Sequence, residues 1–355
     1  YIQKPLERTM ISDLPDAVGV SPVSCVCVCA CILYVSYVYT HRMDSYDKLE
    51  ARAPPTDIED AYRILQGFSY VDFPFISTKS LEFGLFKTYA IPSISSLLVK
   101  TAELTDRCAK RYDDTDLLIR EFTENSPSSS RARRAIQRLN ALHGKYKTIT
   151  NEEYLYVLSV FVVEPIRWVD RFGYRKAHSH ERTSSYMVWR DIGMKMGIKD
   201  IPTSYAAMEE YLEDYEEKFM KFHTCNAKLA GSTSALFLSI IPSFLRPAGM
   251  KVVHALCDRR LRAAMGFPDP PAILTAAVHA LLYLSAIFTR ILLPPRSTPY
   301  KRTPRDEDLV QCSDGTATGC PRFHPYEKTY MHGYRIDELG PEQFIRAREL
   351  GKIFE

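Results

Sequence analysis

A histidine on the apolar face of a predicted helix is the first candidate for chemistry. Ile136, Leu139, His143 and Tyr146 fall at i, i+3, i+7 and i+10, which places all four on one face of a helix. A neutral imidazole in apolar surroundings, with no carboxylate beside it, suits an axial ligand of a haem iron in a dry pocket. A core histidine with satisfied ring nitrogens has the same surroundings. Both interpretations of His143 are open at this point.

Two other groups of polar residues could bind a ligand or a metal. Lys87 is a lone cation in the apolar run 85–89, where a surface lysine would lay its aliphatic stem along apolar neighbours. His178 and His180, next to Glu181, could hold a metal from a loop. No further ligand follows at a suitable spacing, so an exposed helix start is the simpler interpretation of this group.

Common catalytic motifs are missing from the sequence. It has no G-x-S-x-G elbow, H-E-x-x-H zinc helix, C-x-x-C pair, phosphate-binding Walker loop or G-x-G-x-x-G fingerprint. It also lacks the E-x-x-H motif of di-iron bundles, the C-x-x-C-H motif of covalently attached haem and the thiolate loop of cytochromes P450. Any haem would therefore be held without thioether links.

The elements that must position these residues are helices. From Ile58 onward the apolar residues have helical spacing, and no series of alternating strands bounded by turns is visible. The serines at 128–130 provide caps for the helix that carries His143. Thr150 and Glu153 form a capping box ahead of a second, almost wholly apolar helix, which Pro165 should bend or end.

Two further helices follow. One should run from about Glu181 to Met196 and close at Gly197. The next begins after Pro202 and has a neat apolar face. Its other side carries a run of carboxylates, which is most simply a solvated face: Glu209, Glu210, Glu213, Asp214, Glu216 and Glu217.

The uncharged stretch from Ala17 to Tyr39 predicts a membrane anchor. Its 23 residues are long enough as a helix to cross a hydrocarbon core of about 30 Å. Four cysteines lie inside it at every second position, Cys25, Cys27, Cys29 and Cys31. Two residues turn a helix by about 200°, so the four thiols cannot face one metal. They are small apolar residues of a spanning helix, or acceptors for a lipid near the membrane face.

A second apolar stretch, Ile273 to Leu293, has three interpretations. Pairs of prolines bracket it, and only His279 and Arg290 are strongly polar. It could span a membrane, lie on one, or pack on the main domain, and the last interpretation is favoured. From Arg296 onward the chain is polar and rich in Pro and Gly, which predicts a long wrapping tail. The net charge of +3 without a clustered basic stripe argues against nucleic-acid binding.

Several short motifs, in order, resemble one family. They are Phe86-Lys87-Thr88-Tyr89-Ala90-Ile91-Pro92, Arg138-Leu139-Asn140-Ala141-Leu142-His143, Asn151-Glu152-Glu153-Tyr154-Leu155-Tyr156, Pro165-Ile166-Arg167-Trp168-Val169, and Arg260-Leu261-Arg262-Ala263-Ala264-Met265-Gly266-Phe267-Pro268. Together they resemble the fungal ER-bound mpaB-type oxygenases, which share a catalytic domain with bacterial rubber oxygenase (latex-clearing protein). The resemblance spans about residues 61–296, and the order and joint spacing of the motifs carry it.

The resemblance implies a haem b in an all-helical, globin-related domain that uses O₂ to cleave carbon–carbon double bonds of isoprenoid chains. By position, His143 matches the axial ligand of the haem iron. Lys87 and Thr88 match a lysine-threonine pair on the opposite side, where the lysine can ligate the iron and give way to O₂. Thr88 and Arg138 are further candidates for contacts to O₂ or to the haem propionates. Gly84 departs from the pattern, which has an arginine there, and an insertion that includes residues 121–130 lengthens the spacing from Lys87 to His143.

The sequence as a whole therefore predicts an all-α protein with a transmembrane helix ahead of a globin-related haem domain. The expected division is an N-terminal lead (1–16), an anchor (17–39), a linker (40–57), a catalytic domain (58–296) and a polar tail (297–355). The working hypothesis is a haem-dependent oxygenase, single-pass in the ER membrane, that cleaves a lipophilic isoprenoid or terpenoid-type substrate with O₂ in secondary metabolism. A non-catalytic lipid- or haem-binding membrane protein of the same fold is the first alternative. A metal-dependent hydrolase built on His178, His180 and Glu181 is the second.

Overall fold

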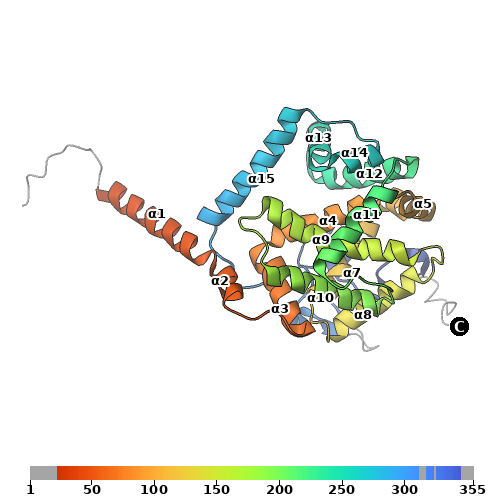
Figure 1. The fold of residues 1–355 in the computed structure, drawn as a ribbon, viewed down its shortest axis with the longest axis horizontal. Helices are drawn as coiled ribbons and strands as arrows, with labels where there is room; N and C mark the ends of the chain where they lie inside the picture. The colour runs from red at the N-terminus through yellow and green to blue at the C-terminus, as the bar shows by residue number, and fades with distance from the viewer. Residues whose placement is uncertain (1–21, 312–316, 324, 345–355) are drawn as a thin grey trace, which may run out of the picture.

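The structure, a computed structural model, describes residues 22–311, 317–323 and 325–344, and almost all of its regular structure is helical (Figure 1). The strands β1 (Val310–Gln311) and β2 (Ala317–Thr318) form one short antiparallel pair. The α-helices are α1 (Pro22–His41), α2 (Asp44–Glu50), α3 (Ile58–Gln66), α4 (Pro74–Thr88), α5 (Pro92–Thr101), α6 (Glu103–Asp106), α7 (Cys108–Thr123), α8 (Ser130–His143), α9 (Asn151–Phe172), α10 (Ser179–Lys195), α11 (Tyr205–Phe219), α12 (Thr224–Phe237), α13 (Arg246–Leu256), α14 (Arg259–Met265) and α15 (Ala272–Leu292). The predicted all-α fold class is confirmed.

Helix α9 lies at the centre of the domain, where α4, α10 and α11 pack against it (Figure 1). It begins with the predicted capping box: the Glu153 N–H donates to Thr150 Oγ1 (3.2 Å) and the Thr150 N–H donates to the Glu153 carboxylate (2.9 Å). The helix does not end at Pro165 but continues to Phe172. Pro165 has no N–H to donate to the preceding turn of the helix. The packing of three helices against α9 compensates for this missing hydrogen bond.

The helices on either side of α9 also begin where the sequence predicted. The Ser129 side chain caps α8 by accepting from the Ala132 N–H, and Ser204 caps α11 in the same way. Helix α10 starts at Ser179, and Gly197 follows its end with a φ of +78°, a conformation that favours glycine. Local capping chemistry thus sets the boundaries of the helices that build the site.

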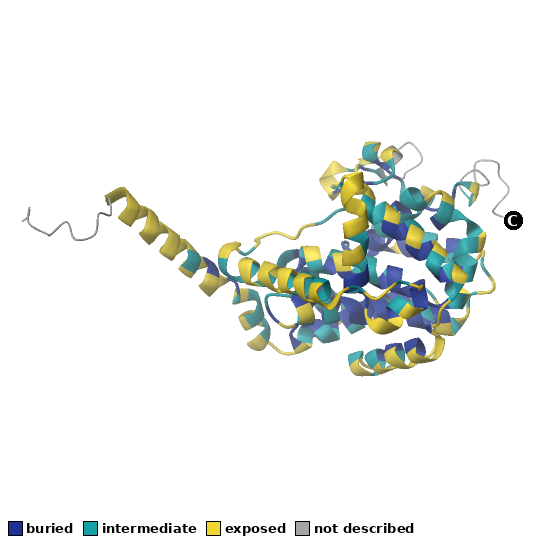
Figure 2. Cartoon of the chain, turned by 90° about the horizontal axis from the view of Figure 1, so that it is seen from above, coloured by how far each residue is buried: buried dark blue, intermediate teal, exposed yellow. Residues whose placement is uncertain are grey.

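Two helices, α1 and α15, stand out because they are apolar and almost wholly exposed (Figure 2). Both are long and apolar enough to cross a membrane. Helix α1 covers the predicted anchor from Pro22 onward, and residues 17–21 of that anchor lie outside the described part of the chain. Helix α15 packs on the main domain along one face only, and none of its residues is buried.

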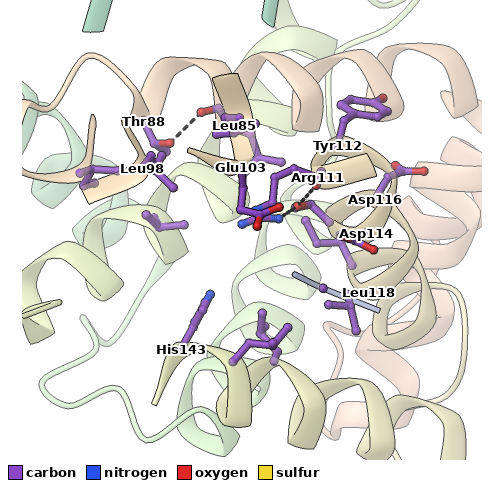
Figure 3. A pocket seen from close by; sticks show the side chains of 18 of the residues that line it. Leu85, Thr88, Leu98, Glu103, Arg111, Tyr112, Asp114, Asp116, Leu118 and His143 are labelled. Carbon is purple, nitrogen blue, oxygen red and sulfur yellow. Dashed lines mark hydrogen bonds between the residues drawn. The ribbon is translucent and has the colours of Figure 1, made fainter. Parts of the chain in front are cut away.

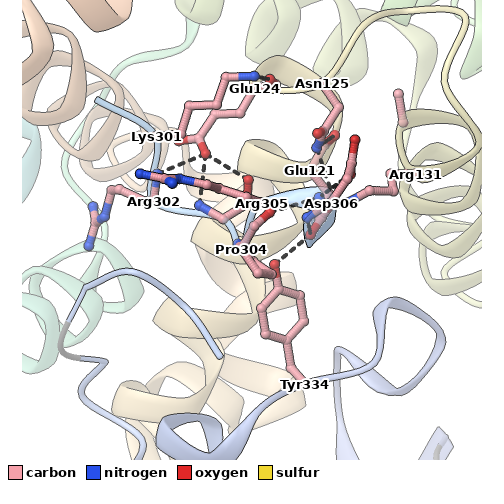
Figure 4. A network of polar contacts seen from close by, with 12 residues as sticks. Glu121, Glu124, Asn125, Arg131, Lys301, Arg302, Pro304, Arg305, Asp306 and Tyr334 are labelled. Atoms are coloured by element: carbon pink, nitrogen blue, oxygen red, sulfur yellow. Dashed lines mark hydrogen bonds and ion pairs between the residues drawn. The ribbon is translucent and has the colours of Figure 1, made fainter. Parts of the chain in front are cut away.

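The described part of the C-terminal tail packs against the helical domain (Figure 4). The Glu124 carboxylate accepts from the Arg302 N–H (2.9 Å), the Thr303 N–H (2.8 Å) and the Thr303 hydroxyl (2.9 Å). Further along, the Tyr334 hydroxyl donates to Glu121. These carboxylates are buried, and the hydrogen bonds from the tail stabilise them together with the Arg131 guanidinium beside Glu121. The tail is therefore a wall of the domain rather than a loose extension.

Candidate active site

A cavity of about 260 Å³ lies beside α9 and is the best candidate for a binding site (Figure 3). Side chains from α4, α5, α7, α8, α9 and α10 line it, and the C-terminal segment closes one side. Most of the lining is aliphatic or aromatic. Its apolar members include Leu85, Leu98, Leu118, Phe122, Leu139, Val157, Phe161, Trp189, Ile192 and Phe344. A cavity of this kind excludes water and accepts an apolar ligand.

His143, the last residue of α8, points into this cavity (Figure 3). Its Nδ1 is buried and has no hydrogen-bond partner among the described residues. Burial, and then the nearby Arg111 guanidinium, lower the pKa of His143 to about 4. The imidazole is therefore neutral at pH 7. The Tyr154 ring, whose centroid lies 5.5 Å from that of His143, packs beside it.

Thr88, at the end of α4, lines the cavity from a different wall than His143 (Figure 3). Its hydroxyl donates to the Leu85 carbonyl over 2.7 Å. The threonine oxygen therefore remains as an acceptor at the cavity wall. The structure brings His143 and Thr88 to the same cavity.

Lys87, the neighbour of Thr88, does not line the cavity. Its Nζ lies 2.9 Å from Glu164 Oε1 on α9 and 2.8 Å from Glu216 Oε1 on α11. All three side chains are buried. Burial opposes the lysine charge, but the two carboxylates outweigh it and raise the pKa of Lys87 above its usual value. The Lys87 ammonium thus belongs to an ion cluster between α4, α9 and α11. This differs from the expectation that Lys87 faces the haem iron.

Glu216 corrects a second expectation, because it is buried although it belongs to the predicted solvated face of α11. Burial raises its pKa to about 7, and the Lys87 ammonium only partly offsets that rise. The Tyr156 hydroxyl lies within 3.4 Å of the same carboxylate. The partner that permits this burial is Lys87, which is 129 positions away in the chain. Helical periodicity gives no information about contacts between residues so far apart.

Arg138, the remaining predicted site residue, lies on α8 and holds the C-terminal segment. Its Nε donates to the Leu339 carbonyl over 2.7 Å, and Leu339 is buried. The next residues, Gly340 and Pro341, line the cavity. Arg138 therefore positions a wall of the cavity and is not itself part of the lining.

The proposed metal group at the start of α10 is a helix cap. Both carboxylate oxygens of Glu181 accept from the Arg175 guanidinium, at 2.6 and 2.8 Å, and one also accepts from the His178 N–H. His178 is buried, not exposed as expected, and its Nδ1 accepts from the His180 N–H. No group of three or more His, Cys, Asp or Glu side chains that could hold a metal ion exists in the part of the chain that the structure describes. With its carboxylate already saturated, Glu181 does not support the hydrolase alternative.

Residues 88–289, more than half of the chain, match the family described as "ER-bound oxygenase mpaB/B'/Rubber oxygenase, catalytic domain". The chain belongs to this family. It is an oxygenase, and hence an oxidoreductase.

Three fungal relatives show how far the similarity extends. An ER-bound oxygenase mpaB' of Penicillium brevicompactum is 30% identical over 340 residues, which cover 83% of this chain and 80% of the relative. An ER-bound oxygenase mpaB of Penicillium roqueforti (strain FM164) is 33% identical over 233 residues, covering 61% and 78% of the two chains. An ER-bound oxygenase mpaB of Penicillium brevicompactum is 33% identical over 207 residues, covering 54% and 53%.

Gly84, where the family resemblance led us to expect arginine, lies at a close contact between α4 and α9. A Cβ at this position would lie 2.8 Å from Cγ1 of Val160. An arginine therefore has no room in this packing. Gly84 faces α9, the helix that also carries Glu164, the partner of Lys87. Gly84 thus permits the close contact between α4 and α9, and it is not part of the cavity lining.

We expect Gly84→Ala to lower the free energy of unfolding by about 1–3 kcal/mol, because the added methyl overpacks the contact with Val160. Urea denaturation followed by circular dichroism would measure the change. Gly231→Ala in α12 is a matched control, since nothing lies within 4 Å of its added Cβ. Combining Gly84→Ala with Val160→Ala should recover part of the loss. An unchanged stability of Gly84→Ala would show that α4 and α9 are not in this contact.

Two parts of the cavity lining were not predicted from the sequence. Arg111 lines it from α7, with Nη1 donating to Thr115, but this arginine stands in a stretch of charged residues that resembles a solvated face. Pro341 and Phe344 line it from the predicted polar tail. Motif patterns do not detect such residues, because only tertiary packing brings them to the cavity.

Proposed function

We propose that this oxygenase uses haem b and O₂ to cleave carbon–carbon double bonds of a lipophilic isoprenoid or terpenoid-type substrate. The observation that carries the proposal is the neutral imidazole of His143, which faces an apolar cavity and whose buried Nδ1 has no hydrogen-bond partner in the described residues. Burying an unpaired imidazole nitrogen costs free energy unless a ligand satisfies it. An iron ion is a partner that suits a neutral imidazole.

The residues around the cavity fit a haem in three respects. His143 would hold the haem iron through its imidazole, and Arg111, a cation at the cavity wall, would pair with a haem carboxylate. The apolar lining would contact the macrocycle and exclude water from it. When bound, the haem would supply an iron that binds and activates O₂. Thr88 would offer its oxygen on the wall, and Arg138 would keep the C-terminal wall in place.

We further propose that α1 anchors the protein in the ER membrane as its single spanning helix. The length and exposure of α1, together with the ER-bound relatives, support this proposal. A membrane location suits the chemistry, because a prenylated substrate partitions into lipid.

The test is the visible absorption spectrum of the purified, detergent-solubilised protein after haem titration, followed by incubation with squalene under ¹⁸O₂. We expect a Soret band, O₂ consumption and carbonyl products that carry ¹⁸O. Cleavage of one double bond by one O₂ gives two carbonyl groups, so label in both products shows that both oxygen atoms are inserted. A folded protein without a Soret band would refute the haem. Haem binding without O₂ consumption on any isoprenoid probe would favour the non-catalytic binding protein.

A further inference from the structure

Helix α15 presents an apolar face to the outside of the protein. Its 21 residues contain no Asp, Glu or Lys, and its only arginine lies in the last turn. On the outward face Ile273 is 82% exposed, Leu281 69% and Leu284 61%. Scattered exposed leucines are ordinary, but a continuous face of this length is not left in water by a stable monomer.

The opposite face of α15 is fixed to the catalytic domain. The His279 imidazole lies 3.1 Å from the Arg171 guanidinium, and the His279 and Tyr283 rings pack against Phe172 at the end of α9. Helix α13 packs on α15 as well. This more polar side faces the protein while the apolar side faces away, which is the reverse of a surface helix in a soluble domain.

The C-terminal end of α15 is tied to the base of α1. The Tyr34 hydroxyl donates to the Leu292 carbonyl (2.9 Å), Arg290 donates to the Tyr39 carbonyl (2.9 Å), and Arg42 donates to the Pro294 carbonyl (3.2 Å). These contacts lie along the last two turns of α1, within about 10 Å of its domain end. If α1 spans the bilayer, the end of α15 lies at the depth of the membrane interface.

The course of α15 argues against a second parallel span. It runs across the direction of α1 rather than alongside it, from the group of α12, α13 and α14 back towards α2 (Figure 1). Both of its ends therefore return to the same domain. A helix held in this way on one side of the membrane lies in the plane of the interface.

The charge near α15 matches a membrane surface. Between residues 220 and 290, which include α12 to α15, the chain has eight Lys and Arg residues but only two Asp and no Glu, and two of the arginines, Arg260 and Arg262, pair with carboxylates. Arg246 and Lys251 of α13, the helix that packs on α15, are exposed. Cations beside an apolar face complement anionic phospholipid headgroups above acyl chains.

We propose that α15 is an in-plane membrane helix, whose apolar face enters the acyl region of an anionic phospholipid leaflet. It is a second attachment that fixes the orientation of the catalytic domain beside the α1 anchor. The proposal rests on the exposed face and the contacts with α1, and it is independent of whether the cavity binds haem.

Neighbouring leucines provide the test. Leu281 is on the outward face, whereas Leu282 is partly buried on the domain side. The full chain carrying Leu281→Trp or Leu282→Trp is reconstituted in vesicles of phosphatidylcholine and phosphatidylinositol that contain brominated phosphatidylcholine. After subtracting the signal of the wild type, we expect bromines near the headgroup end of the acyl chain to quench the tryptophan at 281 at least about twofold more than the one at 282. Equal quenching, or none, would overturn the proposal in favour of a face covered by protein or water.

A topology measurement separates the in-plane helix from a spanning one. Short epitopes are inserted after Asp269 or after Ser297, in the exposed segments that flank α15, and their accessibility is compared in sealed microsomes. We expect both epitopes on the same side of the membrane. Epitopes on opposite sides would show that α15 spans the bilayer and would overturn the proposal.

Discussion

Replacing His143 with glycine is expected to remove the Soret band of the haem-titrated protein, with haem affinity falling at least about tenfold. The variant deletes the neutral imidazole that faces the cavity and leaves a space of its own size. Imidazole added to the solution should enter that space and restore a Soret band, because it supplies the missing ligand without being attached to the chain. Rescue by imidazole separates an axial ligand from a residue that only supports the fold. The measurement is a haem titration followed by absorbance, with and without imidazole.

The control for this experiment is His332→Ala, which removes an exposed histidine of the C-terminal segment and should leave haem affinity unchanged. A full Soret band in His143→Gly without imidazole would mean that another residue holds the iron. Loss of the band in His332→Ala would point instead to a general loss of structure.

The pH dependence of stability should also change in the His143→Gly variant. The pKa of His143 is about 4 in the folded protein, below its ordinary value of 6.5. Between these values the unfolded chain binds more protons than the folded one, so His143 makes stability fall as pH decreases from about 6.5 to about 4. In the haem-free protein, His143→Gly should flatten this part of the curve. Urea midpoints measured across that pH range would test it, and an unchanged slope would mean that His143 is solvated.

Lys87→Met is expected to lower the free energy of unfolding by about 3–5 kcal/mol, because it leaves the buried Glu164 and Glu216 carboxylates without their shared ammonium. The loss should be smaller at low pH. Without Lys87 the carboxylates bind protons more readily in the folded state than in the unfolded chain, and protonation removes the buried charge. Thermal or urea unfolding from about pH 5 to pH 8 would measure the effect.

The double variant Lys87→Met with Glu216→Gln is the matched control, since it removes one buried charge of each sign. It should recover part of the stability lost in Lys87→Met. Haem absorption distinguishes the ion cluster from an iron ligand: Lys87→Met should leave the position of the Soret band unchanged. A shifted band with little loss of stability would show that Lys87 reaches the iron and that the contacts with Glu164 and Glu216 are dispensable.

Helical organisation could be predicted from the sequence because it depends on neighbours a few positions apart. The Thr150–Glu153 capping box and the Ser129 cap are of this kind, and both are present in the structure. The apolar stripe that carries His143 is helical only as far as His143, where α8 ends, so Tyr146 reaches the cavity from the segment that follows the helix. The uncharged N-terminal stretch likewise specifies a helix of membrane length. The family could be predicted from the order of the short motifs, because each motif is a local stretch of sequence.

Only the tertiary structure decided which distant groups become partners. Lys87 is 77 positions from Glu164 and 129 from Glu216, and burying any one of these charges is favourable only when the others are in place. The C-terminal segment becomes a cavity wall because Arg138 and Glu124 hold its backbone, which no periodicity in a polar tail can indicate. The apolar sequence of α15 is compatible with a core, a span or a surface helix. Its environment is set by what packs on each face, and a one-dimensional pattern does not contain that information.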